Sequence, residues 1–381
     1  MWKKKILIFI SCLVTLFMTG CWNYIGLNEM TIVAGVAIDK LDDKYLMSFE
    51  IYDLQRTIPG NPVRPTIVEA TGETIFEAVR NAKKRISNKL YFADADIIIL
   101  SEQIAREEGI NSFLNWFQKD PEIRENLEVI ISQEKTAAEL LKTQGLTNMV
   151  ISTDIQHIVE RDQKTTGSTE ISELYKIYDT INTKGISLTL PAIHIVENNK
   201  KKVIELNGIA IFKDDKLVEF LSPEDTQYYL LAKGKIKGGL IVFGTEFHTN
   251  EKKEQNVALE IKECSASQEY TSYQENNLQI KLKITMDVAL GEFREQFGRL
   301  NEDDIKKLEQ EANDYVKQRI ENVIKKIQKD YNADIMGFGN ILYRTNFKKW
   351  KQWENKITDE FKNIQIDVNP NINIINTGFS E

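Results

Sequence analysis

The sequence predicts an α+β (mixed α/β) protein of three domains, in each of which helices pack on a mostly antiparallel or mixed sheet. At 381 residues, the chain is longer than one hydrophobic core usually organises. Apolar runs of strand length alternate with helical spacing through its first half. A long alternating strand pattern followed by an amphipathic helix opens the last third. Together these patterns indicate several sheet-and-helix units in series.

The first domain is expected over residues 21–198, after a leader at 1–20. Residues 31–39 and 45–54 are two β-rich runs around a turn at 41–44, which predicts a hairpin that belongs to this domain or packs on the next one. The following pattern predicts, in order, a helix at 74–88, a buried strand at 97–100, a helix at 104–118, a strand at 127–132, a helix at 136–142, two helices within 148–182 and a strand at 186–195.

A small α+β middle domain is expected over residues 199–250. Residues 208–212 and 217–221 flank a polar turn and predict a second hairpin. Ser222 is a predicted helix N-cap, because Pro223 and two acidic residues follow it, and Gly234 is the predicted stop. A strand at 239–243 completes this unit.

The C-terminal domain, residues 251–381, is expected to be an antiparallel sheet with a long helix. Alternation from Leu278 to Leu290 predicts a strand with one buried face. Asn301 begins a capping pattern for an amphipathic helix. A turn at 334–339, a helical region through Trp353 and closing strands between 364 and 374 follow.

The leader at 1–20 has the pattern of a secretory signal peptide. Three lysines precede an apolar run from Ile6 to Met18, which as a helix would span roughly 20 Å against the roughly 30 Å needed to cross a bilayer. The tetrapeptide Met18-Thr19-Gly20-Cys21 resembles the lipobox of bacterial lipoproteins, in which the cysteine sulfur is diacylated before cleavage. Cys21 is therefore the expected lipidation site, the alternative being a free or bridged cysteine of an ordinary secreted domain.

The charge balance excludes some partners. Loss of the leader leaves 46 basic against 57 acidic residues, a formal charge of −11. A body this acidic is not expected to bind nucleic acid, and an anionic bilayer would repel it as a whole. We therefore expect membrane attachment through acyl chains rather than through net charge.

The residues with strong chemistry are dispersed. Cys12 leaves with the leader and Cys21 is modified, so Cys264 has no partner for an internal disulfide and is expected to be a small buried hydrophobe. The histidines, His157, His194 and His248, have no metal-ligand spacing, and no phosphate loop or nucleophile motif occurs. We expect no metal, no cofactor and no enzymatic activity.

Four landmarks, taken in order behind the lipobox, carry a family resemblance. They are Cys21-Trp22-Asn23-Tyr24 with the hairpin that contains Ala37-Ile38-Asp39, then Asp120-Pro121-Glu122-Ile123-Arg124, then the run from Gly208 to Val218, and finally Asp334-Ile335-Met336-Gly337-Phe338-Gly339. In these segments the chain resembles the C subunit of spore germinant receptors, the Ger(x)C family of lipoproteins.

The resemblance implies a three-domain lipoprotein, without known enzymatic activity, on the outer face of the spore inner membrane. Its implied partners are the A and B integral membrane subunits of a receptor for nutrient germinants such as amino acids or sugars. Two other functions stay open. A solute-binding lipoprotein of a transporter should have two similar lobes and a hinge, and an anchored cell-wall hydrolase should have an acid pair or a metal set.

Each landmark residue also has a structural interpretation. Trp22 is either an interface anchor beside the lipid or a buried aromatic residue. Asp120 is a predicted helix-start cap, and Arg124 follows it in the same landmark. At the last landmark Asp334 opens a turn in which Gly337 and Gly339 are expected to supply backbone shape rather than direct partner contact.

Overall fold

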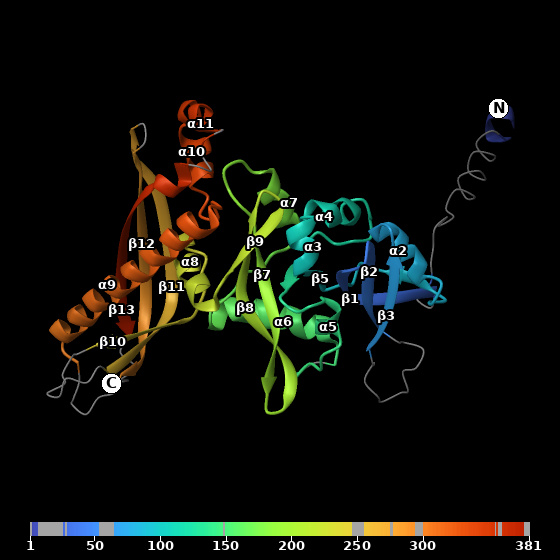
Figure 1. The fold of residues 1–381 in the computed structure, drawn as a ribbon, viewed down its shortest axis with the longest axis horizontal. Coiled ribbons are helices and arrows are strands. Elements are labelled where there is room, and N and C mark those ends of the chain that lie inside the picture. Colours follow the sequence, from blue (N-terminus) through green and yellow to red (C-terminus); the bar gives the residue numbers. More distant parts are fainter. Residues whose placement is uncertain are drawn as a thin grey trace.

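The structure is a computed structural model that describes residues 2–6, 26, 29–52, 65–147, 149–245, 255–274, 277–293, 300–354, 356 and 360–376. Figure 1 shows two lobes side by side, an N-terminal lobe in blue to green and a C-terminal lobe in yellow to red. Within these residues there are two sheets, one of nine strands and one of four, each covered by helices. The predicted mixed α/β class is confirmed, with two sheets in place of the three expected.

The N-terminal sheet has the order β3-β2-β1-β5-β6-β7-β8-β9, and β4 pairs with β1 beside this path. Its strands are β1 (Met30–Leu41), β2 (Lys44–Tyr52), β3 (Pro65–Gly72), β4 (Lys89–Tyr91), β5 (Ile97–Ser101), β6 (Glu128–Ser132), β7 (Thr189–Asn198), β8 (Lys201–Lys213) and β9 (Lys216–Leu221). β1, β5, β6 and β7 run parallel, and antiparallel hairpins extend the sheet at both ends. The parallel centre is therefore buried on both faces.

Helices cover both faces of this sheet. The helices are α2 (Ile75–Ala82), α3 (Glu102–Glu107), α4 (Asn111–Phe117) and α7 (Leu174–Asn182) on one face, and α5 (Ala138–Leu141) and α6 (Ile151–Thr165) on the other. Alternate residues of one strand point to opposite layers: Ile98 and Leu100 pack with the first group, and Ile97 and Ile99 pack with the second.

The helix predicted at 104–118 is two helices in the structure. α3 ends at Glu107 and α4 begins at Asn111, because Gly109 between them has φ +83. A left-handed residue ends an α-helix, so the apolar periodicity continues while the axis changes direction.

Residues 199–250 do not form a sheet of their own, which corrects the expected middle domain. Asn199 and Lys200 have φ of 50° and 64°, the backbone of a two-residue hairpin turn, so β8 folds back on β7 and β9 on β8. β10 (Leu240–Thr245) instead pairs with β11 in the second sheet. The polar stretch at 198–200 is thus a hairpin turn within the first sheet.

Helix α8 (Pro223–Lys233) lies between the lobes (Figure 1). The Ser222 side chain accepts a hydrogen bond from the Asp225 N–H, and Gly234 ends the helix at φ 62, as predicted. Leu230 and Leu231 belong to one core that also contains Ile209 of β8 and the strands of the second sheet. The two lobes therefore share a hydrophobic core through α8.

The C-terminal lobe is a four-stranded sheet crossed by a long helix. Its elements are β10, β11 (Gln255–Gln274), β12 (Asn277–Phe293), α9 (Glu302–Lys326), the π-helical turn η3 (Ile327–Tyr331), α10 (Phe338–Thr345), α11 (Phe347–Trp353), η4 (Phe361–Asn363) and β13 (Gln365–Asn376). Asn301 caps α9, as predicted, and the structure shows that Asp304 completes a capping box. β10, β11 and β12 are antiparallel.

The strand β13 runs parallel to β12, so the C-terminal sheet, expected to be antiparallel, is mixed. Helix α9 and the helices after it carry the chain back across the sheet before β13 starts, and such a crossover lets two strands run parallel. The closing strands expected between 364 and 374 are this single strand.

Candidate functional site at the lobe junction

The turn after η3 is built around the Asp334 carboxylate. One oxygen of Asp334 accepts hydrogen bonds from the N–H groups of Gly337 at 2.7 Å and Phe338 at 3.1 Å, and the other accepts from Gly339 at 2.7 Å. Gly337 has φ +76, a left-handed conformation that favours glycine. A carboxylate in this place satisfies backbone donors that the first turn of α10 leaves open.

The turn contacts the N-terminal lobe through backbone atoms. The Ser187 N–H donates to the Asp334 carbonyl at 2.9 Å, and the Asn340 N–H donates to the Gly185 carbonyl at 2.7 Å. A Cβ at Gly185 would lie 2.4 Å from the carbonyl carbon of Gly339, so the two backbones approach too closely for a side chain. The last landmark of the sequence is therefore part of the contact between the lobes.

The side chain of Lys233, at the end of α8, also binds this turn. Its ammonium group donates to the carbonyl of Met336 at 2.8 Å and to that of Ile335 at 3.4 Å. Burial lowers the pKa of Lys233 to about 8, and burial raises the pKa of Asp334 to about 6, against the opposing effect of the three N–H donors and Lys233. Both groups are thus charged between about pH 6 and pH 8.

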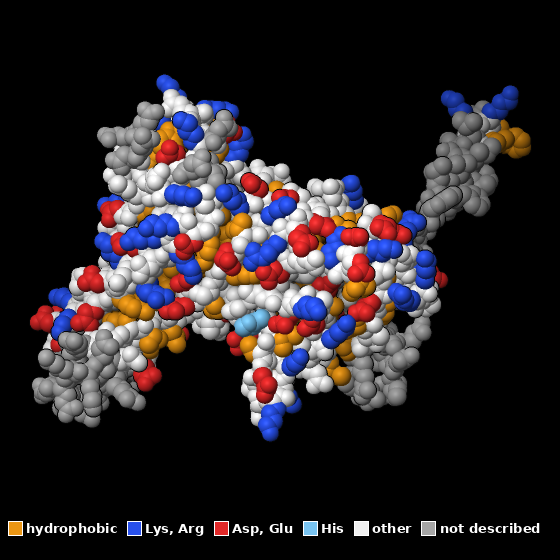
Figure 2. Space-filling model, in the orientation of Figure 1, with side chains coloured by type: hydrophobic (Ala, Val, Ile, Leu, Met, Phe, Trp, Pro, Cys, Tyr) orange, Lys and Arg blue, Asp and Glu red, His pale blue; other side chains and the backbone are white. Residues whose placement is uncertain are grey.

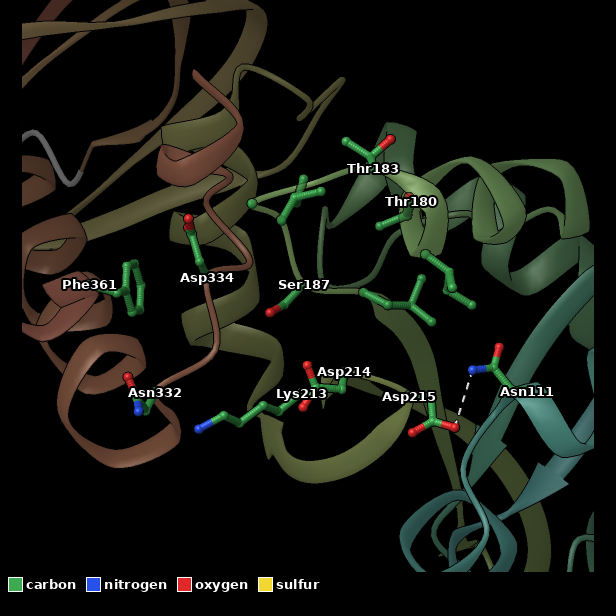
Figure 3. A pocket seen from close by; sticks show the side chains of 14 residues that line it. Asn111, Thr180, Thr183, Ser187, Lys213, Asp214, Asp215, Asn332, Asp334 and Phe361 are labelled. Atoms are coloured by element: carbon green, nitrogen blue, oxygen red, sulfur yellow. Dashed lines mark hydrogen bonds between the residues drawn. The ribbon is translucent and has the colours of Figure 1, made fainter. Parts of the chain in front are cut away.

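A cleft of about 530 Å³ lies beside this contact, between the lobes (Figure 3). The polar residues named in Figure 3 line it, with Asp334 and Asn332 on one side and Asn111 and Asp215 on the other. The Asn111 amide donates to the Asp215 carboxylate at 3.2 Å. The described lining residues include no histidine or cysteine.

Two of the acidic residues that line this cleft, Asp334 and Asp215, already have structural roles. Asp334 binds three backbone N–H groups, and the Asp215 carbonyl accepts the Ile110 N–H at 2.7 Å. The Thr180 and Thr183 hydroxyls donate to carbonyls one helical turn earlier. The arrangement therefore fixes the two lobes relative to one another.

Asp120 and Arg124 lie apart from this junction. Asp120 accepts the Glu122 N–H at 3.0 Å in a turn, not at the start of a helix, which corrects the expected helix cap. It borders a hollow of about 820 Å³ lined also by Tyr45, Phe76 and Trp116. Arg124 and Asp94, 3.9 Å apart, are both more than half exposed, and such a pair contributes little to stability.

The predictions for the cysteines and for the anchor region have different outcomes. Cys21 and Trp22 lie outside the described residues. Cys264 is half-buried and unpaired, and burial raises its pKa to about 11, so its thiol is protonated at neutral pH, in agreement with the expected inert residue. The described residues hold no cluster of three potential metal ligands.

No helix in the described part of the chain has the length and apolar character needed to cross a membrane.

The sequence predicted a role for Asp334 and Gly337, but it did not predict the residues that contact their turn, which are Lys233, Gly185 and Ser187. Their role depends on contacts with residues about 100 or more positions away. One signal was available: α8 is apolar around most of its circumference, with Thr226 and the run from Tyr228 to Ala232 buried. A helix of this kind lies between two layers, which would have placed Lys233 at an internal contact.

The change Gly185→Ala is expected to destabilise the protein by about 1–3 kcal/mol. The residue has φ +73, and the added methyl group would meet the backbone of Gly339. Thermal unfolding measures the loss, with Gly291→Ala as control, because a Cβ there has no contact closer than 3.4 Å. Equal melting temperatures for Gly185→Ala and wild type would show that the loop moves freely and that this close contact does not hold the lobes.

The fold and this junction define a two-lobed α+β protein whose lobes differ in topology and are locked by backbone contacts and a shared core. Residues 23–195 match the family described as "Spore germination protein N-terminal domain", and residues 207–378 match "Spore germination B3/ GerAC like, C-terminal". The chain belongs to this family of spore germination proteins.

Similar proteins cover nearly the whole chain. Spore germination protein KC of Bacillus subtilis (strain 168) is 21% identical, covering 99% of this chain and 96% of the relative. Spore germination protein GerQC of Bacillus cereus is 23% identical, covering 97% and 98%. Spore germination protein A3 of Bacillus subtilis (strain 168) is 25% identical, covering 97% and 96%. The crystal structure of the GerBC protein is similar in fold, with a TM-score of 0.57, 18% identity and coverage of 90% of this chain and 97% of that chain.

Proposed function

We propose that this protein is a lipid-anchored, non-enzymatic subunit of a nutrient germinant receptor on the outer face of the spore inner membrane. Its partners would be the A and B integral membrane subunits. The observation that carries the proposal is the match to spore germination families over residues 23–195 and 207–378, behind the lipobox-like Met18 to Cys21. The family is not a known enzyme family.

The junction supports a mechanical role. Lys233, Asp334 and Gly185 hold the lobes in one arrangement by hydrogen bonds and close backbone contact. A subunit with fixed lobes presents its surfaces to membrane partners at a fixed separation. When a partner binds one lobe, no binding free energy is spent on ordering the other lobe. This is how a non-catalytic subunit can set the geometry of a receptor.

A solute-binding lipoprotein has less support. That class should have two similar lobes. The two described sheets differ instead, because one has nine strands, the other has four, and their strand orders are different. In the cleft between the lobes, the carboxylates of Asp334 and Asp215 are engaged in backbone and side-chain hydrogen bonds. A free solute would have to displace these contacts.

The test of the anchor is Cys21→Ala. Two or more acyl chains on one residue give stable membrane binding, so the change is expected to remove lipid labelling and to shift most of the protein out of the salt-washed membrane fraction. Metabolic lipid labelling and fractionation of wild type and variant measure both effects. Cys264→Ala is the matched control, since that thiol is internal and unpaired. An unlabelled wild type, or a variant that stays on the membrane, contradicts the anchor.

The test of the receptor role is co-purification. Isolated from spore membranes in mild detergent, the wild type should bring A and B integral subunits with it. Spores lacking the protein should lose nutrient germination and keep germination by a receptor-independent trigger. Normal nutrient germination in the absence of every protein of this family would contradict the role.

A further inference from the structure

The end of the N-terminal lobe at which the fold begins is locally basic, although the protein is acidic overall. Between Ala78 and Ala93 there are five basic residues and no acidic one. They are Arg80, Lys83, Lys84, Arg85 and Lys89, here called the basic segment, and they extend from α2 to β4. Figure 2 shows Lys and Arg side chains at this outer end of the lobe. The negative net charge of the whole protein therefore does not apply to this part of its surface.

Most of the charge of the basic segment is unneutralised. Arg80, Lys83, Lys84 and Arg85 are exposed, and no ion pair involves them among the described residues. Arg85 donates to the backbone carbonyl of Glu69, which leaves its charge in place. Lys89 pairs with Glu122. Of the nearby acids, Glu73 pairs with Lys44, whereas Glu77 accepts the Glu73 N–H and keeps its negative charge.

An apolar side chain accompanies these charges. Phe76, on the first turn of α2, is 53% exposed, and the Arg80 guanidinium lies 4.8 Å from its ring centre. Exposed aromatic residues beside basic ones are the composition of surfaces that enter the headgroup region of a bilayer.

The chain enters the fold at this same place. Met30, the first residue of β1, pairs with Lys89 of β4 in parallel register. Met30 lies nine residues after Cys21, so an extended chain reaches at most about 30 Å between them. If Cys21 is at the membrane, a chain of this length lets the basic segment reach the headgroups.

We infer that the basic segment, with Phe76, is a membrane-docking surface that binds anionic lipid headgroups and fixes the orientation of the lobes above the bilayer. The inference rests on the proposed lipid anchor at Cys21. The anchor attaches the protein, and the basic segment orients it. A basic residue is attracted to an anionic leaflet within a Debye length of about 8–10 Å, whereas the acidic remainder of the protein is repelled. Each basic residue so placed changes membrane partitioning by about fivefold.

The experiment is lysine footprinting on the full-length lipidated protein. The protein is reconstituted in vesicles of phosphatidylcholine alone or with a third of phosphatidylglycerol, and an amine-reactive reagent is applied in each. Lys83 and Lys84 are expected to react several-fold more slowly on the anionic vesicles. Lys201 and Lys202, exposed at the tip of the β7–β8 hairpin, serve as internal controls that should react equally on both.

A charge-reversal variant gives the second measurement and keeps the reporter lysines. Arg80→Glu with Arg85→Glu should abolish the protection of Lys83 and Lys84, and Arg161→Glu with Arg344→Glu, two exposed arginines elsewhere, should leave it intact. If the first pair lowers the melting temperature, Arg80→Gln with Arg85→Gln replaces it and should reduce the protection in the same direction.

The outcomes separate this inference from the anchor. Protein that floats with both vesicle types and labels equally on both keeps the anchor and overturns the docking surface. Protein that floats only with anionic vesicles supports the docking surface and contradicts the anchor, and flotation with neither contradicts both. Protection in spore membranes that does not occur on anionic vesicles would assign the surface to a protein partner and overturn the lipid assignment.

Discussion

The change Glu128→Gln is expected to stabilise the protein by about 3 kcal/mol near pH 8.5 and to have little effect near pH 5. Glu128 is the first residue of β6 and is 3% exposed, and its Oε2 atom has no hydrogen-bond partner among the described residues. Burial, the largest cause, and the nearby carboxylates of Glu160 and Glu173 together raise its pKa to about 8. The folded protein therefore holds Glu128 protonated at neutral pH.

The sign of the pH dependence follows from that direction. The unfolded chain ionises Glu128 near its ordinary pKa of about 4.3, whereas the folded chain keeps the proton to about pH 8. Its contribution to stability is complete below the unfolded pKa and is lost as the pH rises through about 8, at up to about 1.4 kcal/mol per pH unit. Glutamine is the neutral isostere of the protonated acid, so the variant has no such loss.

Thermal unfolding of wild type and variant from pH 5 to pH 9 measures the effect. Glu197→Gln, an exposed glutamate at the end of β7, is the matched control and should leave the pH profile unchanged. A stability difference that stays constant across the range would mean that Glu128 is not protonated in the folded protein, and the argument from burial would be wrong.

Much of the secondary structure could be predicted because its signals are local. The first hairpin turns between Leu41 and Lys44, Ser222 and Gly234 cap α8, and Asn301 caps α9, as the sequence indicates. In each case the deciding hydrogen bond or backbone angle lies within a few residues.

Strand pairing was predicted less well because it depends on distant residues. β8 and β9 have the same local pattern whether they form a small separate sheet or extend a larger one, and the difference lies in the pairing of β8 with β7. β13 alternates in the same way whether it is parallel or antiparallel to β12. The direction of β13 is set by the crossover through α9, and the residue pattern within β13 does not depend on that crossover.

The same limit applies to two buried ionisable residues, Glu128 and Lys233. Residues 127–132 have the pattern of a buried strand, and Glu128 within that run was a signal of an unusual environment that periodicity alone does not interpret. Lys233 has the position of an ordinary basic residue at a helix end. Its contact with the turn after Asp334 is made only when the C-terminal lobe closes on α8.

Loss of the carboxylate in Asp334→Ala is expected to destabilise the protein by about 3–5 kcal/mol. The change leaves the N–H groups of Gly337, Phe338 and Gly339 without their acceptor, and it removes the negative charge that favours the ammonium form of buried Lys233. Because the turn meets Ser187 of the N-terminal lobe, the junction should loosen along with α10. Thermal unfolding and protein abundance in spore membranes measure the loss.

Two further variants separate charge from backbone shape. Asp334→Asn should have an intermediate effect, because its amide keeps one oxygen acceptor but turns an NH₂ group towards backbone donors. Gly337→Val retains the carboxylate but forces a β-branched residue to φ +76, at a cost of about 1–3 kcal/mol. A Cβ there would also lie 3.1 Å from Ile186 of the N-terminal lobe.

The coupling between Asp334 and Lys233 decides whether the turn acts as one unit. Lys233→Met removes the buried charge and keeps the length of the chain, so adding it to Asp334→Ala should cost less than the sum of the two single changes, since no uncompensated ammonium group remains. In spores, abundance and nutrient germination should fall together across these variants, while germination by a receptor-independent trigger stays normal. Additive stabilities would show that the two charges act separately. If Asp334→Ala folds, accumulates and melts like wild type yet abolishes the nutrient response, the turn is a surface that contacts a partner, and its role in fixing the lobes is wrong.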